Sequence, residues 1–276
     1  MEHTRVRRRP DSLGTPLRIA GRLALLLGLS GLARPAAAEP VAAVVEMYTS
    51  QGCAACRAAD PIMRELAAQP GVLALTLPVT YWDYLGWKDT LALRGFNERQ
   101  RAYAHARGAR QVVTPQAVVN GGQAVIVGSN RPALDKALKD AGQAPPLPVT
   151  VSAQTQGPLI VIDVSGRAPD TATATATAKP KPAGKGEDKA EVWLVPLVRS
   201  RVTKVETGEN GGRVANDVNI VRSLQRLGSW AGQPVHFEIP ATGGVLDGAD
   251  GYAVLVQYAR EGRIGRILGA AKGPGL

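Results

Sequence analysis

The two cysteines of this 276-residue chain, Cys53 and Cys56, lie in the stretch S-Q-G-C-A-A-C-R-A-A-D-P. Two thiols at this spacing can form a redox couple, provide half of a metal site or close a small disulfide staple. A disulfide that closes a loop of about four residues removes little entropy from the unfolded chain, so a staple here would add about 2 kcal/mol of stability at most. Exported proteins that need disulfides for stability usually have several, closing longer loops. The staple interpretation is therefore weak.

A metal site has little support from the rest of the chain. A tetrahedral zinc site needs four ligands. Of the three histidines, His3 lies in the N-terminal leader, while His105 and His236 fall in different predicted domains. We therefore predict no metal site and no cofactor. Two thiolates alone could still bind a soft ion such as Cu(I), so a metallochaperone stays open as an alternative.

The residues around the pair favour redox chemistry. The run V-A-A-V-V-E-M-Y-T at 41–49 predicts a buried strand, and the pair opens a predicted helix that continues to Ala68. The free amides and the dipole of a helix start stabilise a thiolate, so we expect a lowered pKa for the Cys53 thiol. Cys56 lies one turn further into the helix and would be the more buried, resolving thiol.

Three further residues fit the same chemistry. The predicted order strand, cysteine helix, strand, helix, strand, strand, helix matches the thioredoxin fold, in which a cis-proline begins the strand that faces the cysteines. Thr114-Pro115 lies where that feature belongs, so we predict a cis bond in contact with the pair; the alternative is an ordinary trans proline. Glu46 interrupts the apolar strand, and as a buried carboxylate it could take the proton of Cys56. A carboxylate that is only hydrogen-bonded, or that faces solvent, is the alternative.

The second half of the chain has a different pattern. After A-P-P-L-P at 144–148, short β-branched and aromatic runs recur between turn residues, which predicts a small β-sandwich. The predicted fold class is thus α/β, with a thioredoxin-like N-terminal domain at 41–145 followed by a β-rich, sandwich-like C-terminal domain at 149–276. The low-complexity tract at 172–186 cannot bury a core and predicts a disordered loop at about 166–190.

The N-terminus predicts export. An arginine-rich start, an apolar run at 23–33 and small residues before Glu39 have the pattern of a signal peptide over residues 1–38. The apolar run is about half of the roughly 20 residues that a membrane span needs. We therefore expect cleavage, and a periplasmic or secreted mature protein that does not span a membrane.

The charge of the chain depends strongly on this leader. It carries seven arginines and two acidic residues, so its removal lowers the formal charge from +10 to +5. The mature chain has no basic cluster with interleaved aromatic residues, which argues against a nucleic-acid partner.

Five segments have distinctive sequences: V-E-M-Y-T-S-Q-G-C-A-A-C-R-A-A-D, Y-W-D-Y-L-G-W-K-D, F-N-E-R-Q-R-A-Y-A, V-V-T-P-Q-A-V-V-N-G and G-E-N-G-G-R. Through them the chain resembles, over roughly residues 41–271, a family of exported bacterial proteins catalogued as domain of unknown function 1223. The resemblance implies export and a thioredoxin-like domain followed by a β-rich segment. It also implies that the family's cysteine pair and Thr-Pro correspond to Cys53, Cys56 and Thr114-Pro115. It implies no activity, because none is established for the family.

The same motifs supply further candidate residues. Those expected to line a substrate groove over the cysteines are Trp82, Asp83, Trp87, Arg99 and Gln100. For the tryptophans, an aromatic core is the alternative. For G-E-N-G-G-R at 208–213, the simplest interpretation is a hairpin turn.

Together these observations predict an exported thiol–disulfide oxidoreductase-like protein, with Cys53 as nucleophile and Cys56 as resolving thiol. Its partners would be protein thiols or disulfides, or a small thiol, and a membrane electron donor or acceptor is compatible with the sequence. The alternative is a thioredoxin-fold binding protein, or a Cu(I) chaperone, without redox turnover.

Overall fold

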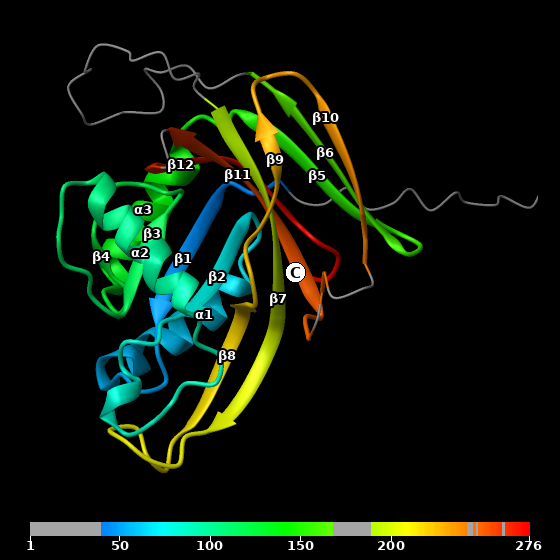
Figure 1. Ribbon diagram of the computed structural model, residues 1–276. Helices are drawn as coiled ribbons and strands as arrows, with labels where there is room; N and C mark the ends of the chain where they lie inside the picture. The colour runs from blue at the N-terminus through cyan, green and yellow to red at the C-terminus, as the bar shows by residue number, and fades with distance from the viewer. Residues whose placement is uncertain (1–39, 168–188, 242–244, 247, 261–262) are drawn as a thin grey trace, which may run out of the picture. The chain divides into compact units, whose positions relative to one another are not determined.

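A large β-sheet organises the chain (Figure 1). The computed structural model describes residues 40–167, 189–241, 245–246, 248–260 and 263–276. The predicted signal peptide lies outside these residues, as does most of the predicted disordered loop.

The described residues contain three α-helices, two short 3₁₀ helices and twelve strands. The helices are η1 (Ala54–Ala58), α1 (Ala59–Ala67), η2 (Asp83–Leu85), α2 (Arg94–Ala106) and α3 (Arg131–Gln143). The strands are β1 (Ala43–Thr49), β2 (Val72–Pro78), β3 (Gln116–Val119), β4 (Ile126–Val127), β5 (Val149–Gln156), β6 (Leu159–Gly166), β7 (Lys189–Lys204), β8 (Val214–Val221), β9 (Gln225–Trp230), β10 (Val235–Pro240), β11 (Gly251–Arg260) and β12 (Arg263–Lys272).

Strands from both ends of the chain share the large sheet. Among the described residues it has nine strands in the order β12-β11-β7-β8-β2-β1-β3-β4, with β9 paired to β7. A second sheet has the order β10-β6-β5. The link between the early and late strands is the pairing of β2 with β8, which matches Thr76 to Ile220. The Thr76 hydroxyl also donates a hydrogen bond to the carbonyl oxygen of Val218 at 2.6 Å.

The predicted fold class is wrong. The described structure is β-rich, with 44% strand and 21% helix, and does not show a thioredoxin-like α/β domain followed by a separate β-rich domain. Strands β1 to β4 continue into the same sheet as β7, β8, β11 and β12. The prediction failed because hydrophobic patterns identify single strands, whereas the pairing of β2 with β8 joins residues more than a hundred positions apart.

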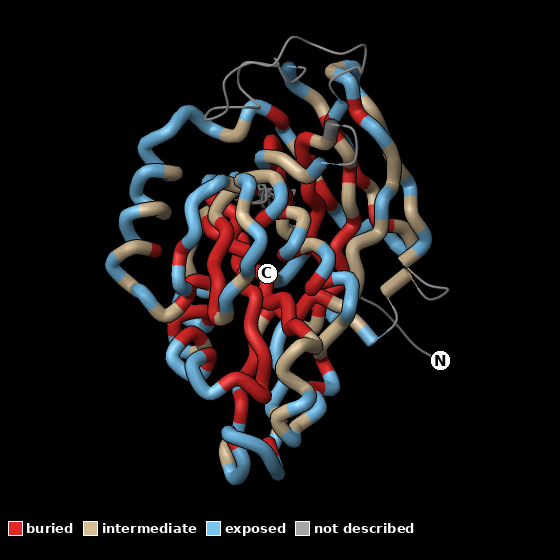
Figure 2. The backbone as a smooth tube through the Cα atoms, turned by 60° about the vertical axis from the view of Figure 1, so that its left-hand side comes forward, coloured by how far each residue is buried: buried red, intermediate tan, exposed pale blue. Residues whose placement is uncertain are grey.

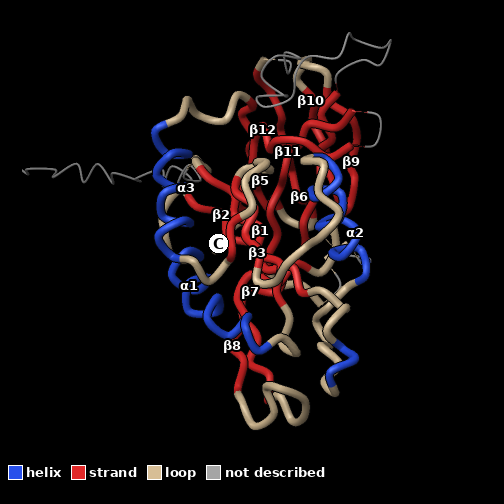
Figure 3. The backbone as a smooth tube through the Cα atoms, turned by 90° about the vertical axis from the view of Figure 1, so that its left-hand side faces the viewer, coloured by secondary structure: helices blue, strands red, loops and turns tan. Residues whose placement is uncertain are grey.

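The helices lie on both faces of the strands. Along β1, Val45 and Met47 pack into a core that includes residues of α1 and α3, whereas Val44 and Tyr48 pack into a core that includes residues of α2. This alternation follows from the two-residue repeat of a strand. Figure 3 shows α1 and α3 on one side of the strands and α2 on the other. The strands between them form the buried interior in Figure 2, and α3 is largely exposed.

The small sheet packs against the large one through a shared apolar core. This core contains Ile160 and Ile162 of β6 together with Val192 of β7 and Val254 of β11. The two backbones lie close together at Gly269 of β12, where an added Cβ would come within 2.5 Å of the Val149 carbonyl oxygen. Glycine is therefore required at this point of the sheet contact.

A buried ion pair joins β1, α2 and β11. The Glu46 carboxylate is fully buried and accepts hydrogen bonds from Arg99 Nε at 2.6 Å and from the Tyr103 hydroxyl. Arg99 also donates to Gln257 Oε1 at 2.9 Å. The charge of Glu46 is thus compensated by a cation and by a hydroxyl donor, as a buried charge requires.

We expect the Arg99→Met variant to be destabilised by about 3–5 kcal/mol, because the Glu46 carboxylate loses its cation while it stays buried. The double variant Glu46→Gln/Arg99→Met should recover much of this loss. Urea unfolding with an unchanged m-value measures both.

A matched control is Arg131→Met. Arg131 pairs with Glu65 and Asp135 at the surface, so its loss should cost less than about 1 kcal/mol. Equal losses in the two single variants would contradict a special role for the buried pair.

Candidate functional site

Cys53 and Cys56 form a disulfide at the start of the first helical segment. Their Cα atoms are 5.3 Å apart. Cys53 is the N-cap residue of η1, which runs directly into α1, and the Cys56 N–H donates to the Cys53 carbonyl oxygen at 3.1 Å. Both residues are only 1% exposed. The disulfide is therefore covered by other parts of the chain.

Thr114 contacts the disulfide from the strand side. The Thr114-Pro115 bond is cis, and Thr114 Oγ1 lies 3.5 Å from Cys53 Sγ in a geometry suited to donation. The predicted cis bond and its contact with the pair are therefore confirmed. Thr114 Oγ1 in turn accepts a hydrogen bond from Trp82 Nε1 at 2.7 Å.

The segment Tyr81–Leu91, here called the aromatic loop, lies over residues Ser50–Cys56, here called the cysteine turn. An added Cβ at Gly52 would come within 3.3 Å of the Trp82 carbonyl oxygen and 3.4 Å of the Trp87 carbonyl oxygen. Trp87 Nε1 donates to Gln51 Oε1 at 3.1 Å. Asp83 acts inside the loop, where its Oδ1 accepts from the Asp89 N–H at 3.3 Å.

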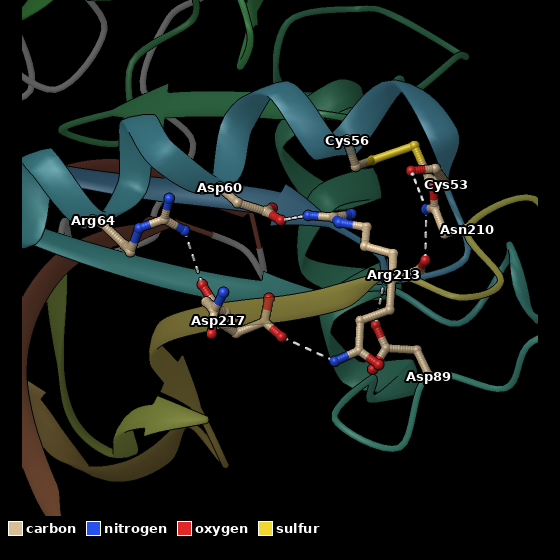
Figure 4. Close-up of polar contacts among 10 residues, drawn as sticks. Cys53, Cys56, Asp60, Arg64, Asp89, Asn210, Arg213 and Asp217 are labelled. Carbon is tan, nitrogen blue, oxygen red and sulfur yellow. Dashed lines mark hydrogen bonds and ion pairs between the residues drawn. A yellow bond between two sulfur atoms is a disulfide. The ribbon is translucent and has the colours of Figure 1, made fainter. Parts of the chain in front are cut away.

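The segment Val205–Arg213, here called the strap, connects β7 to β8 and crosses the cysteine turn (Figure 4). Asn210 Nδ2 donates to the carbonyl oxygens of Gln51 at 2.7 Å and Cys53 at 3.0 Å. At the end of the strap Arg213 forms an ion pair with Asp60 of α1. The prediction of a hairpin turn for G-E-N-G-G-R is confirmed, since the segment joins the antiparallel strands β7 and β8. The prediction did not include its contact with the backbone of Cys53. The available signal was an asparagine in a glycine-rich segment, but its acceptors lie more than 150 positions away.

Two buried acids, Asp89 and Asp217, accept hydrogen bonds from Gln51, which lies in the cysteine turn. Asp89 Oδ2 accepts from the Gln51 N–H, and Asp217 Oδ2 accepts from Gln51 Nε2, both at 2.9 Å. Burial raises the pKa of Asp89 to about 6; the charges of Asp217 and Asp83 add to this, and hydrogen bonds from backbone N–H groups oppose it. Burial also raises the pKa of Asp217, against the hydrogen bond from Gln51.

The structure places Arg99 and Gln100 away from the disulfide. Gln100 is buried and donates to the Val113 carbonyl oxygen and to Gln116 Oε1, both at 2.8 Å, so it supports the segment around Pro115 from behind. Arg99 borders a cleft of about 560 Å³ between α2 and the large sheet, whose lining includes no residue of the cysteine turn, the aromatic loop or the strap. Of the five predicted groove residues, only Trp82, Asp83 and Trp87 lie in segments that contact the cysteine turn.

Glu46 belongs to the ion pair with Arg99 described above. In the part of the chain that the structure describes, no hydrogen bond joins Glu46 to either cysteine. Its role as proton acceptor for Cys56 stays a prediction.

Comparison with known proteins identifies the family. Residues 44–257 match the family described as "Protein of unknown function (DUF1223)". The chain belongs to this family. The resemblance predicted from the sequence motifs is therefore confirmed. Among curated proteins, none matches the chain.

Two solved structures resemble this member of the DUF1223 family. A crystal structure of a protein from Agrobacterium tumefaciens has 33% sequence identity and a TM-score of 0.68, with 85% of this chain and 94% of that chain covered. HBP35 of Porphyromonas gingivalis has 12% identity and a TM-score of 0.50, with 87% and 76% covered. At so low an identity, the second likeness shows the fold alone.

The described residues contain no group of three or more His, Cys, Asp or Glu side chains arranged to hold a metal ion. No helix within them is long and apolar enough to cross a membrane.

We expect Asp89→Asn to change how the stability of this DUF1223 protein depends on pH. The folded pKa of about 6 lies above the ordinary value of 3.8, so the folded state binds the extra proton between these values. The stabilising contribution of Asp89 is therefore fully present below about pH 4 and is lost as the pH rises through about 6.

Two pKa units correspond to about 3 kcal/mol at most. Between pH 4 and pH 7 the unfolding free energy of the wild type should thus fall relative to that of Asp89→Asn, as urea unfolding at several pH values would measure. Parallel pH profiles for the two proteins would contradict this assignment.

Proposed function

We propose that this protein is an exported thiol–disulfide oxidoreductase in which Cys53 is the exchanging sulfur and Cys56 the resolving sulfur. A partner thiolate attacks Cys53 Sγ, forms a mixed disulfide and releases Cys56 as a thiolate. A second partner thiolate then attacks the partner's sulfur in that mixed disulfide and releases Cys53. The partner dithiol loses two electrons and becomes a disulfide, and these two electrons reduce the Cys53–Cys56 disulfide to two thiols. The protons of the partner thiols pass to Cys53, Cys56 or solvent. The reverse sequence reduces a partner disulfide.

The contact between the Thr114 hydroxyl and Cys53 Sγ carries this proposal. A hydroxyl donor stabilises a thiolate more than a thiol, so it lowers the pKa of the sulfur that it contacts. In the part of the chain that the structure describes, the Thr114 hydroxyl contacts the sulfur of Cys53 and not that of Cys56. The two sulfurs are thereby made unequal, as a nucleophile and a resolving thiol must be.

Trp82 orients this donor. Because Trp82 Nε1 donates to Thr114 Oγ1 at 2.7 Å, the oxygen acts as acceptor toward the indole and its own hydrogen stays free to point at the sulfur. The position of Cys53 at the N-cap of η1, ahead of the first-turn amides, acts in the same direction.

The place of action and the partners are part of the proposal. The arginine-rich leader and its apolar run support export, which would bring the pair to an oxidising compartment where disulfides persist. We propose protein thiols or disulfides, or a small thiol, as partners.

A binding protein with an idle cysteine pair is the second candidate. It is favoured by the burial of both sulfurs, since reactive cysteines are usually partly exposed. Labelling of the reduced protein with a thiol reagent, with and without Cu(I), separates the candidates. Slow labelling that Cu(I) abolishes would favour binding, and rapid labelling of one cysteine would favour exchange.

The Cys56→Ser variant should trap mixed disulfides through Cys53, because the resolving step is lost. The Cys53→Ser variant should trap none under the same conditions. Incubation with a disulfide-bonded model protein, followed by non-reducing electrophoresis and mass spectrometry, measures both. Trapping through Cys56 in the Cys53→Ser protein, or none in Cys56→Ser, would contradict the assigned roles.

We expect Thr114→Val to raise the pKa of Cys53 by about one unit, since a hydrogen bond to a charged group is worth about 1.5–3 kcal/mol at normal length and this contact is long. The Cys56→Ser background leaves one thiol, and the pH dependence of its alkylation rate reports its pKa. Thr150→Val on β5 provides a control with the same change of side chain at an exposed position. An unchanged pH profile in Thr114→Val would show that the hydroxyl does not act on the thiolate.

A further inference from the structure

In this structure the disulfide is not accessible to a partner thiol. Exchange requires the incoming sulfur to reach one sulfur of the pair, yet Cys53 and Cys56 are each only 1% exposed. Part of the cover must therefore move before any partner can react. Two segments could move: the aromatic loop, which lies over Gly52, and the strap, which donates a hydrogen bond from Asn210 to the Cys53 carbonyl oxygen.

The strap touches the aromatic loop through a glycine. Gly208 has a φ of +73°, and an added Cβ would come within 3.0 Å of the Leu85 carbonyl oxygen and 3.2 Å of Trp87 Cβ. The Thr207 hydroxyl donates to the Gly86 carbonyl oxygen beside this contact. Two chain segments that are more than 100 positions apart are thus held together over the cysteine turn.

The strap has the properties of a segment that opens locally. Most of it is exposed, including Glu206, Thr207, Gly208 and Glu209, so little apolar surface holds it in place. Two of its residues are buried: Val205 at its start, which is 0% exposed, and Asn210, which is 2% exposed and donates both of its hydrogen bonds from Nδ2. Asn210 Oδ1 is buried without a hydrogen-bond partner among the described residues. Opening of the strap would let water reach this oxygen and hydrogen-bond to it.

We propose that the strap, Val205–Arg213, gates access to the Cys53–Cys56 disulfide and thereby decides which thiols can reach it. In the closed state the bonds of Asn210 and the packing of Gly208 keep the aromatic loop and the cysteine turn together. Opening of the strap releases both, while the Arg213–Asp60 ion pair retains its far end on α1. The inference rests on the proposed exchange function, but it concerns access rather than chemistry.

The test compares two glycine variants of the strap. Gly208→Ala forces a methyl group into the contact with the aromatic loop. Gly212→Ala is the matched control, because Gly212 has a similar φ of +82° but nothing lies within 4 Å of its added Cβ. Both variants carry the same left-handed backbone strain, so their difference isolates the contact between the strap and the aromatic loop.

The full-length oxidised protein is treated with dithiothreitol under native conditions, and the freed thiols are counted by mass spectrometry after rapid alkylation. We expect Gly208→Ala to be reduced about tenfold faster than the wild type, and Gly212→Ala to stay within about twofold of it. Thr207→Val, which removes only the hydroxyl bonded to Gly86, should accelerate reduction by about threefold and serves if Gly208→Ala does not fold.

The urea dependence of the reduction rate separates local opening from global unfolding. A slope well below the equilibrium m-value supports the gate, whereas a slope equal to it would show that reduction needs global unfolding. Equal rates in Gly208→Ala and Gly212→Ala, or an unchanged rate in Thr207→Val, would overturn the gate. Because dithiothreitol replaces any natural partner, the gate can fail while mixed-disulfide trapping succeeds, and the reverse outcome is equally distinguishable.

Discussion

Gln51 lies in the cysteine turn and joins it to three other parts of the structure through four hydrogen bonds. Its backbone N–H donates to Asp89, its carbonyl oxygen accepts from Asn210, its side-chain nitrogen donates to Asp217 and its side-chain oxygen accepts from Trp87. A buried polar group that loses its partner costs about 1–3 kcal/mol. The cysteine turn, the aromatic loop, the strap and β8 must therefore assemble together, because the absence of any one leaves a buried group of Gln51 unsatisfied.

This constraint explains why the position of the disulfide is fixed by many contacts, although the loop that it closes is short. Within the cysteine turn, the Cys56 N–H donates to the Cys53 carbonyl oxygen, and Ser50 accepts from the Cys53 N–H and the Gly52 N–H. The position of the turn comes from neighbours that are remote in the chain, with Thr114 at the sulfur and Asn210 at the backbone. The chemistry proposed for the pair thus depends on one set of residues for the pKa of the thiolate and on another for access.

The strand order of the large sheet brings these segments together. The strap is the connection between β7 and β8, and β8 pairs with β2, which is itself the neighbour of β1. The loops that follow β1 and β2 are the cysteine turn and the aromatic loop. A sheet that ended at β2 would leave the disulfide without the strap, and would leave the buried face of the turn without Asp217.

The sequence alone predicted the features that depend on near neighbours in the chain. The buried strand before the cysteines and the helical segment that they open follow from local hydrophobic pattern and helix-start chemistry. The cis bond at Thr114-Pro115 was predicted from the order of the elements and from the place of this proline before a strand. The motifs also identified the family correctly.

Only the tertiary structure decided how these pieces combine. It joined β2 to β8, brought Asn210 onto the carbonyl oxygen of Cys53 and turned Arg99 toward Glu46 instead of the cysteines. The physical reason is that a buried hydrogen bond or strand pairing is selected by the whole set of donors, acceptors and apolar faces that must be satisfied at once. A pattern along one segment carries no information about which distant segment will satisfy it.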